Sequence, residues 1–290
     1  MEIAVEDLTV RYGRHLALAG VSLHLTEGVT GLLGPNGAGK STLMKVLATL
    51  LPPQAGRVRI GPWVLPRDQH PVRERLGYLP QQFGLPGNLT GREYLQYAAA
   101  MKGAPAAEAE ALLEAVGLAE AADRPIRTYS GGMHQRLGIA QALLGDPDLV
   151  VVDEPTAGLD PEQRTRFRHL LTRRRPGRVT LFSTHVVADL DQVADRVVVL
   201  HRGQVRFTGT LGELAALAEG WVWVMERPVG APPPPGATVV SEQWADGQVL
   251  TRVIAPKRPD PAARPVPPTP EDGYLVVIRS AAPAERGDRR

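Results

Sequence analysis

The residues with the clearest chemistry lie in one glycine-rich stretch, residues 34–42. They follow the pattern G-x-x-x-x-G-K-[ST], which is typical of a loop that binds phosphates. Glycines without a Cβ let the backbone N–H groups turn toward phosphate oxygens, the lysine reaches the β- and γ-phosphates, and the hydroxyl is offered to Mg²⁺. The pattern predicts nucleotide binding by the whole loop: Gly34, Pro35, Asn36, Gly37, Ala38, Gly39, Lys40, Ser41 and Thr42.

The sequence around this loop predicts the elements that must position it. Residues 29–33 form a short apolar run, typical of a strand, and residues 40–50 follow as a helix whose N-terminus favours anions. A chance glycine-rich turn is the alternative, and it is expected in roughly one such chain in a few hundred. The loop therefore indicates nucleotide binding, while the process that the nucleotide drives has to be read from other residues.

A second candidate site follows another apolar run, residues 149–152, which ends at Asp153 and Glu154. Four continuous aliphatic residues are typical of a strand buried on both faces of a parallel sheet, and ligands bind at the carboxyl edge of such sheets. We expect Asp153 to hold Mg²⁺, directly or through water, and Glu154 to act as general base on the attacking water. The structural alternative is two acids that merely end a strand.

Two more polar residues come directly after predicted strands. Gln81 follows the run at residues 76–80, where its side-chain carbonyl can ligate Mg²⁺ or position water. His185 follows the run at residues 179–183, where it can donate to a γ-phosphate. A lone glutamine is by default a solvated loop amide and a lone histidine is usually structural, so the predictions depend on these strand-end positions.

Two further candidates are less specific. Ser130, Gly131 and Gly132 open a predicted helix that runs to residue 144, and a hydroxyl, bare backbone N–H groups and a helix dipole together favour an anion. Tyr12 follows the first predicted strand, residues 3–10, and either caps that strand or stacks on a purine base. Taken alone, the S-G-G triplet is a common loop sequence.

In this order the motifs resemble the ATP-binding cassette of ABC transporters, over about residues 1–215. The matching strings are the phosphate-binding loop, YLPQ at 78–81, YSGGM at 129–133, VVVDEP at 150–155, GLD at 158–160 and STH at 183–185. The resemblance implies ATP as the nucleotide, adenine stacking by Tyr12, a Q-loop role for Gln81 and a nucleotide-binding role for Asp160. The string YSGGM departs from LSGGQ, the family's commonest form, and lacks its glutamine side chain.

The resemblance also implies a fold and a function. The fold is an α/β P-loop NTPase domain with a mixed sheet core, an antiparallel β subdomain and a helical subdomain. The chain is most similar to stand-alone ATPases of bacterial drug and small-molecule exporters, which hydrolyse ATP to ADP and phosphate and power a separate membrane permease. Two copies would enclose two ATP molecules, each between the P-loop of one copy and Ser130 of the other.

Two alternatives to an exporter subunit stay open. One is an importer ATPase, which the sequence excludes less well because importer ATPases carry the same motifs. A soluble ABC ATPase of translation or DNA repair is disfavoured more strongly, since the chain has a single cassette and no coiled-coil insertion. The helical insertion over residues 89–116 is, in the resembled family, the surface that touches the membrane partner.

Composition limits the remaining function classes. The 33 basic and 31 acidic residues nearly cancel, which argues against a dedicated nucleic-acid binder. The absence of cysteine excludes disulfides and thiolate chemistry. There is no apolar run of about 18 residues, and a strand pattern starts at once, so we expect a cytoplasmic protein, peripheral on the inner face of the cell membrane through the permease.

The amino-acid composition of the chain changes near residue 219. We expect the ATP-binding cassette in residues 1–218 and a small proline-rich accessory region in residues 219–290, because twelve of the 27 prolines lie between Pro228 and Pro270. Apolar runs at residues 221–224, 248–254 and 274–278 predict a few strands there. We expect the last dozen residues to be frayed, and we find no catalytic pattern in this region.

Overall fold

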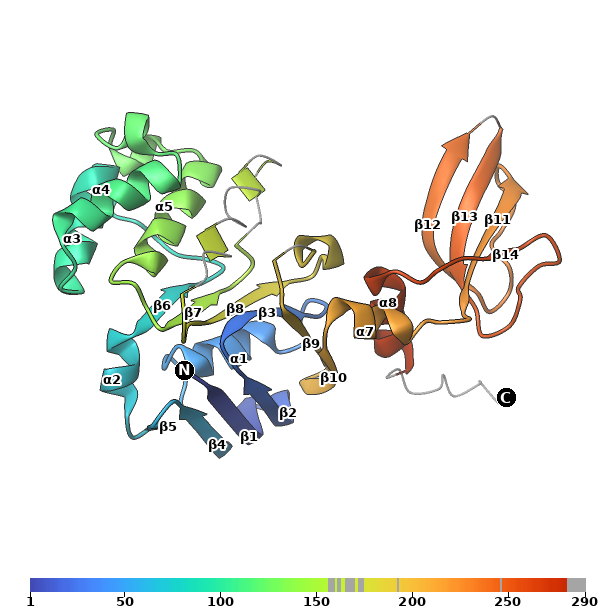
Figure 1. Cartoon of the computed structure of the whole chain (residues 1–290), viewed down its shortest axis with the longest axis horizontal. Helices are drawn as coiled ribbons and strands as arrows, with labels where there is room; N and C mark the ends of the chain where they lie inside the picture. Colours follow the sequence, from blue (N-terminus) through green and yellow to red (C-terminus); the bar gives the residue numbers. More distant parts are fainter. Residues whose placement is uncertain are drawn as a thin grey trace. The chain divides into compact units, whose positions relative to one another are not determined.

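In the computed structural model the chain forms two compact units, Met1–Val205 and Arg206–Arg290 (Figure 1). The structure describes residues 1–155, 160, 163–164, 170–171, 175–191, 193–245 and 247–280. The division between the units falls inside strand β10 (Gln204–Gly209), whereas the sequence predicts a boundary at residue 218. Residues 158–159 and the last ten residues lie outside the described residues. So do most of residues 161–175, where Pro161 as a first helical residue predicts a helix.

A six-stranded sheet forms the centre of the first unit, in the order β10-β9-β3-β8-β7-β6. Its other strands are β3 (Gly28–Leu33), β6 (Leu76–Leu79), β7 (Leu149–Val152), β8 (Val179–Thr184) and β9 (Arg196–His201). These five strands pair in parallel, so their carboxyl ends lie at one edge of the sheet. The phosphate-binding loop, Asp153 and His185 all leave the sheet at that edge, as the sequence predicts.

A four-stranded antiparallel sheet packs beside the central one, in the order β2-β1-β4-β5. Its strands are β1 (Ile3–Tyr12), β2 (His15–Leu25), β4 (Ala55–Ile60) and β5 (Trp63–Leu65). Alternate apolar residues of these strands share one core with helix α1 (Lys40–Leu47) and with the central strands. Helix α1 ends three residues earlier than predicted, because Thr49 takes a positive φ of 59°, which a helix cannot continue.

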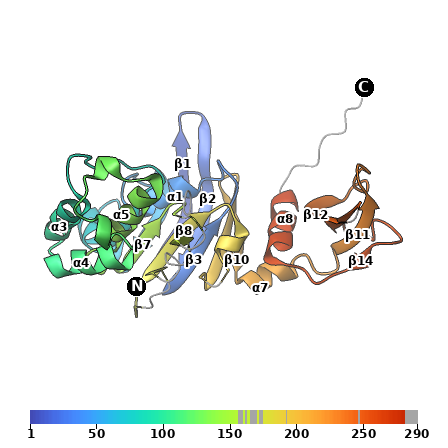
Figure 2. The same ribbon diagram turned by 90° about the horizontal axis from the view of Figure 1, so that it is seen from above.

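The helical subdomain is the third part of the first unit, and in both views its helices lie together (Figures 1 and 2). It contains α3 (Gly91–Met101), α4 (Ala106–Ala115), α5 (Gly131–Leu143) and the short helices η1 (Ala119–Ala121) and η2 (Ile126–Thr128). Thr90 caps α3 through a capping box with Glu93. A short helix η3 (Val187–Asp189) follows β8.

The polar stretch at residues 66–71 predicts a turn region, but part of it belongs to helix α2 (Gln69–Glu74). Pro71 is the third residue of this helix. In the first turn of a helix the backbone N–H has no intrahelical partner, so a proline there costs no hydrogen bond.

The second unit contains a four-stranded antiparallel sheet in the order β12-β13-β11-β14. Its strands are β11 (Val222–Pro228), β12 (Thr238–Ala245), β13 (Gln248–Ile254) and β14 (Arg264–Pro265), with helices α7 (Leu211–Ala216) and α8 (Pro270–Ser280). The strand predicted over residues 274–278 is wrong, since these residues belong to α8. Among the described residues, no helix is both long and apolar enough to cross a membrane.

Local hydrogen bonds explain why α8 is a helix. The Thr269 hydroxyl accepts from the Asp272 backbone N–H at 3.4 Å, and the Asp272 carboxylate accepts from the Thr269 backbone N–H at 2.7 Å. This reciprocal pair is a capping box, and Pro270 occupies the first helical position, where its fixed φ suits a helix. These start signals override the strand preference of the Val276-Val277-Ile278 run.

Candidate nucleotide-binding site

A cavity of about 410 Å³ lies beside the phosphate-binding loop in the first unit. Its lining contains most of the loop together with residues from four other places in the chain: Tyr12, His15, Ala17, Asn36, Gly37, Ala38, Gly39, Lys40, Ser41, Thr42, Gln81 and Glu154. Tyr12 has about half of its surface exposed, so its ring is free to stack on a ligand. The sequence analysis did not single out His15 or Ala17, which carry no motif and lie in β2, after the turn that follows β1.

Two glycines of the loop are required by its backbone geometry. Gly39 has a φ of 107°, and a Cβ there would lie 2.6 Å from the carbonyl oxygen of Ala17. A Cβ on Gly34 would lie 2.2 Å from the carbonyl oxygen of Leu200. The loop can therefore fold against its neighbours only with hydrogen in place of a side chain at both positions.

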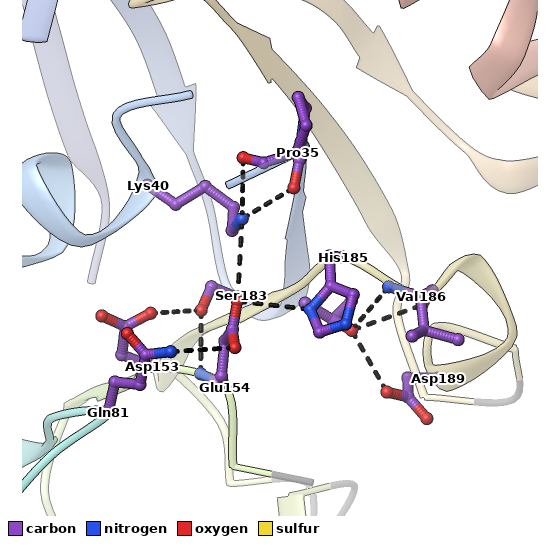
Figure 3. Close-up of polar contacts among 11 residues, drawn as sticks. Pro35, Lys40, Gln81, Asp153, Glu154, Ser183, His185, Val186 and Asp189 are labelled. Atoms are coloured by element: carbon purple, nitrogen blue, oxygen red, sulfur yellow. Dashed lines mark hydrogen bonds and ion pairs between the residues drawn. The ribbon is translucent and has the colours of Figure 1, made fainter. Parts of the chain in front are cut away.

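Lys40 is the first residue of α1, and its side chain is almost fully buried. Its Nζ donates to the carbonyl oxygens of Gly34, at 2.6 Å, and Pro35, at 3.2 Å, and lies 3.8 Å from Glu154 Oε1 (Figure 3). Burial lowers the pKa of Lys40, and the negative charge of Glu154 opposes that effect. The arrangement fixes a cationic donor at the cavity, where phosphate oxygens can replace the carboxylate as its partner.

The Glu154 carboxylate is where several predicted site residues meet. Gln81 Nε2 donates to Glu154 Oε2 at 3.1 Å, and His185 Nδ1 lies 3.3 Å from Glu154 Oε1 (Figure 3). With Lys40, these contacts bring together residues that are up to 145 positions apart in the chain. Glu154 takes a positive φ of 49°, a conformation that non-glycine residues rarely adopt.

The adjacent carboxylate of Asp153 is buried at the end of β7 and has a partner that the sequence analysis missed. Ser183 Oγ donates to Asp153 Oδ1 at 2.5 Å, and Ser183 Oγ also accepts the backbone N–H of Glu154 at 2.9 Å. Ser183 stands in the STH string, but only His185 was assigned a role there.

Burial raises the pKa of the nearby Tyr78 to about 12, and the charge of Asp153 adds to the rise, so this phenol stays protonated at neutral pH.

Six predicted nucleotide-binding residues are not in the cavity lining: Gly34 and Pro35 at the start of the loop, and Ser130, Gly131, Gly132 and Asp160 elsewhere in the chain. Ser130 precedes α5, and its Oγ accepts the backbone N–H of Met133 at 3.3 Å, while Gly131 and Gly132 begin the helix. Asp160 is exposed, and its Oδ1 accepts the backbone N–H of Gln163 at 2.8 Å. A single chain therefore gathers the P-loop, Gln81, Glu154 and His185, and leaves the S-G-G helix start and Asp160 outside the cavity lining.

The donor atoms near the loop suit a magnesium ion that is shared with phosphates. No group of three His, Asp or Glu side chains in the described part of the chain could hold a metal by itself. The candidates are instead the Ser41 hydroxyl, the Gln81 amide oxygen and the Asp153 carboxylate, which are all oxygen ligands. Mg²⁺ prefers oxygen, and it usually takes only one or two carboxylates when substrate phosphates complete its shell.

Comparison with known proteins identifies the family of this site. Residues 18–157 match the ABC transporter family. The chain is 41% identical over 224 residues to the daunorubicin resistance ATP-binding protein DrrA3 of Streptomyces coeruleorubidus, a match that covers 75% of this chain and 71% of that protein. The chain belongs to the ABC transporter family.

Solved structures agree with this assignment. One is titled the structure of the ATP-binding subunit of an ABC transporter; it has a TM-score of 0.69 and 31% identity and is matched over 74% of this chain and 92% of its own. Another is the dimeric post-hydrolysis state of the ATP-binding cassette MJ0796 bound to ADP and Pi, with a TM-score of 0.66, 26% identity, and coverage of 72% and 98%. The ABC fold and the ATPase activity predicted from the motifs are confirmed.

Proposed function

We propose that this ABC protein is the ATP-hydrolysing subunit of an exporter, working on the inner face of the cell membrane with a separate integral membrane permease. The observation that carries the proposal is the convergence of Lys40, Gln81 and His185 on the Glu154 carboxylate beside the P-loop cavity. The name of the relative described above, a drug resistance protein, favours export over import.

Each group at the cavity has a chemical role in ATP hydrolysis. Tyr12 stacks on the adenine, and the N–H groups of the loop with Lys40 bind the phosphates. Ser41, Gln81 and Asp153 hold Mg²⁺, which neutralises charge that develops on the transferred phosphoryl group.

Glu154 is the general base of this proposal. In the structure its carboxylate faces the Lys40 amine at 3.8 Å. A γ-phosphate that binds Lys40 would take over this cation, which frees a carboxylate oxygen to accept a proton from the attacking water. His185, which contacts the same carboxylate, is placed to keep it oriented and to donate to the γ-phosphate.

The S-G-G helix start and Asp160 serve the nucleotide of a second copy. Ser130 is exposed at the N-terminus of α5, away from the lining of its own chain's cavity, and a helix N-terminus with an exposed serine hydroxyl suits an anion. The dimeric MJ0796 cassette bound to ADP and Pi supports this arrangement by analogy. We propose further that residues 1–218 are the cassette and residues 219–290 an accessory region.

Deletion of the gene in the source organism, followed by reintroduction of wild-type or mutant genes, tests the exporter role. Cells without the chain should accumulate a transported amphipathic antibiotic and become more sensitive to it. The wild-type gene should reverse both effects, and Glu154→Gln, expressed at the same level, should reverse neither. Lower accumulation in the deletion strain would indicate import, and full rescue by Glu154→Gln would show that hydrolysis at this site does not drive transport.

A further inference from the structure

Ser183 occupies an unusual position between the two acids of the site. It lies on β8, the neighbour of β7 in the sheet, and its side chain is completely buried. Its single oxygen makes two hydrogen bonds: it donates to the Asp153 carboxylate at 2.5 Å and accepts the Glu154 backbone N–H at 2.9 Å (Figure 3). One hydroxyl therefore contacts both the predicted metal-binding carboxylate and the backbone of the predicted base.

The bond to Glu154 matters because of the backbone conformation at that residue. With a φ of 49°, Glu154 lies in the left-handed region, which non-glycine residues adopt only when surrounding contacts hold them there. The bond from its N–H to Ser183 fixes the peptide group that joins the two acids. That same conformation directs the Glu154 carboxylate to Gln81, at 3.1 Å, and to His185, at 3.3 Å.

The bond to Asp153 orients the other acid. Asp153 is almost fully buried, so its carboxylate has few ways to satisfy its oxygens. The Ser183 hydroxyl occupies one lone pair of Oδ1 and thereby sets the direction of the remaining ones. Groups that orient a metal-binding carboxylate in this way commonly change metal affinity or activity by 10–100-fold when they are removed.

We propose that Ser183 is a positioning residue for ATP hydrolysis, which couples the orientation of the Mg²⁺-binding Asp153 to the backbone conformation of the base, Glu154. The proposal rests on the roles given above to these two acids. Ser183 would then be a second functional residue of the STH string besides His185. It acts by orienting Asp153 and Glu154 and does not contact the nucleotide itself.

Substitutions at position 183 test the proposal in the full-length chain. Threonine and valine have the same shape, but only threonine keeps the hydroxyl, so the pair Ser183→Thr and Ser183→Val isolates the hydrogen bonds from the packing. We expect Ser183→Val and Ser183→Ala to lower kcat at least tenfold and to raise the Mg²⁺ concentration for half-maximal activity about tenfold. Ser183→Thr should stay within about threefold of the parent chain.

Binding of a fluorescent ADP analogue gives a readout that does not depend on turnover. With Mg²⁺ present, Ser183→Val should bind the analogue more weakly than Ser183→Thr. With EDTA the two should agree within about twofold, because the P-loop and Tyr12 are unchanged. The matched control is Thr180→Val, a buried hydroxyl on the same strand, which should leave kcat and the Mg²⁺ dependence unchanged.

Two results would overturn the proposal. One is equal Mg²⁺ dependence in the valine and threonine variants, and the other is a loss in Thr180→Val as large as that in Ser183→Val. A parent chain that hydrolyses no ATP would instead contradict the proposed function, and the Mg²⁺-dependent binding of the analogue would still decide the role of Ser183.

Discussion

Replacing Asp272 by asparagine should loosen helix α8 in the second unit. The Asp272 side chain is completely buried and accepts hydrogen bonds from Arg252 Nη2 at 2.6 Å and from the Thr269 backbone N–H and hydroxyl at 2.7 and 2.8 Å. Burial by itself raises the pKa of Asp272, but these hydrogen bonds outweigh it and lower the pKa below its ordinary value. The ionised carboxylate therefore stabilises this unit at neutral pH.

The expected magnitude follows from these contacts. Loss of one partner of a buried ion pair costs about 3–5 kcal/mol, and asparagine keeps an acceptor oxygen, so we expect a smaller loss of about 2 kcal/mol. That value corresponds to a roughly 30-fold larger equilibrium constant for the opening of α8. Because the folded-state pKa is lowered, the stabilisation is present above the unfolded pKa and disappears as pH falls through the folded pKa. The difference between wild type and Asp272→Asn should therefore vanish in acid.

Hydrogen–deuterium exchange of peptides from α8 measures this opening at pH 7. Urea unfolding followed by tryptophan fluorescence covers the acid range, since Trp221, Trp223 and Trp244 all belong to the second unit. Glu271→Gln is the matched control, because it removes the neighbouring acid, whose side chain is exposed. The reasoning is refuted if Asp272→Asn exchanges as slowly as wild type, or if the control accelerates exchange equally.

Three further predictions concern the first unit. Lys40→Ala removes the cation at the cavity and should abolish ATP binding; micromolar binding by calorimetry would count against the P-loop site. Gly39→Ala places a Cβ 2.6 Å from the Ala17 carbonyl oxygen at a φ of 107°, so ATP affinity should fall at least tenfold in the same assay, and an unchanged affinity would contradict the close approach. Thr90→Ala removes the capping box of α3 and should cost about 1 kcal/mol of stability in urea unfolding, with Thr90→Ser near wild type.

The sequence predicts which residues lie together at the cavity wherever their grouping depends on local spacing or on the ends of buried strands. The P-loop pattern places its glycines and Lys40 in one short stretch of the chain, and the structure brings most of that stretch, residues 36–42, to the lining of one cavity. The acids at residues 153–154 and His185 were located because each directly follows a buried strand. Parallel pairing then brings these strand ends to one edge, as general rules for such sheets predict.

The features that were missed depend on contacts that spacing does not reveal. Ser183 makes two hydrogen bonds to residues about 30 positions away, and the residues next to Ser183 in the sequence do not predict these bonds. Strand β12 begins just after a proline-rich loop and its residues 241–244 are all exposed, so it lacks the alternating pattern that predicts a strand. Residues 274–278 have strand preferences, but the capping signal before them prevails.

Shared use of Ser130 has its own test in a mixing experiment. Ser130→Arg should block hydrolysis while each chain still binds ATP at its own P-loop. Mixed with Lys40→Ala chains, it should regain part of the activity, because one of the two composite sites in a mixed dimer is then intact. If mixed dimers form but no activity returns, the shared-site arrangement is wrong.

The most direct test of the central claim, that Glu154 is the general base of an ATP-bound dimer, is size-exclusion chromatography of Glu154→Gln with Mg²⁺ and ATP, paired with a hydrolysis assay. Glutamine keeps the size and hydrogen bonding of the side chain but cannot accept the proton, and a positioned base contributes roughly 10²–10⁴ in rate. We expect hydrolysis to fall by that factor while the variant elutes as a dimer with ATP and the wild type elutes mainly as a monomer. Hydrolysis at the wild-type rate would show that another group is the base and would contradict the mechanism.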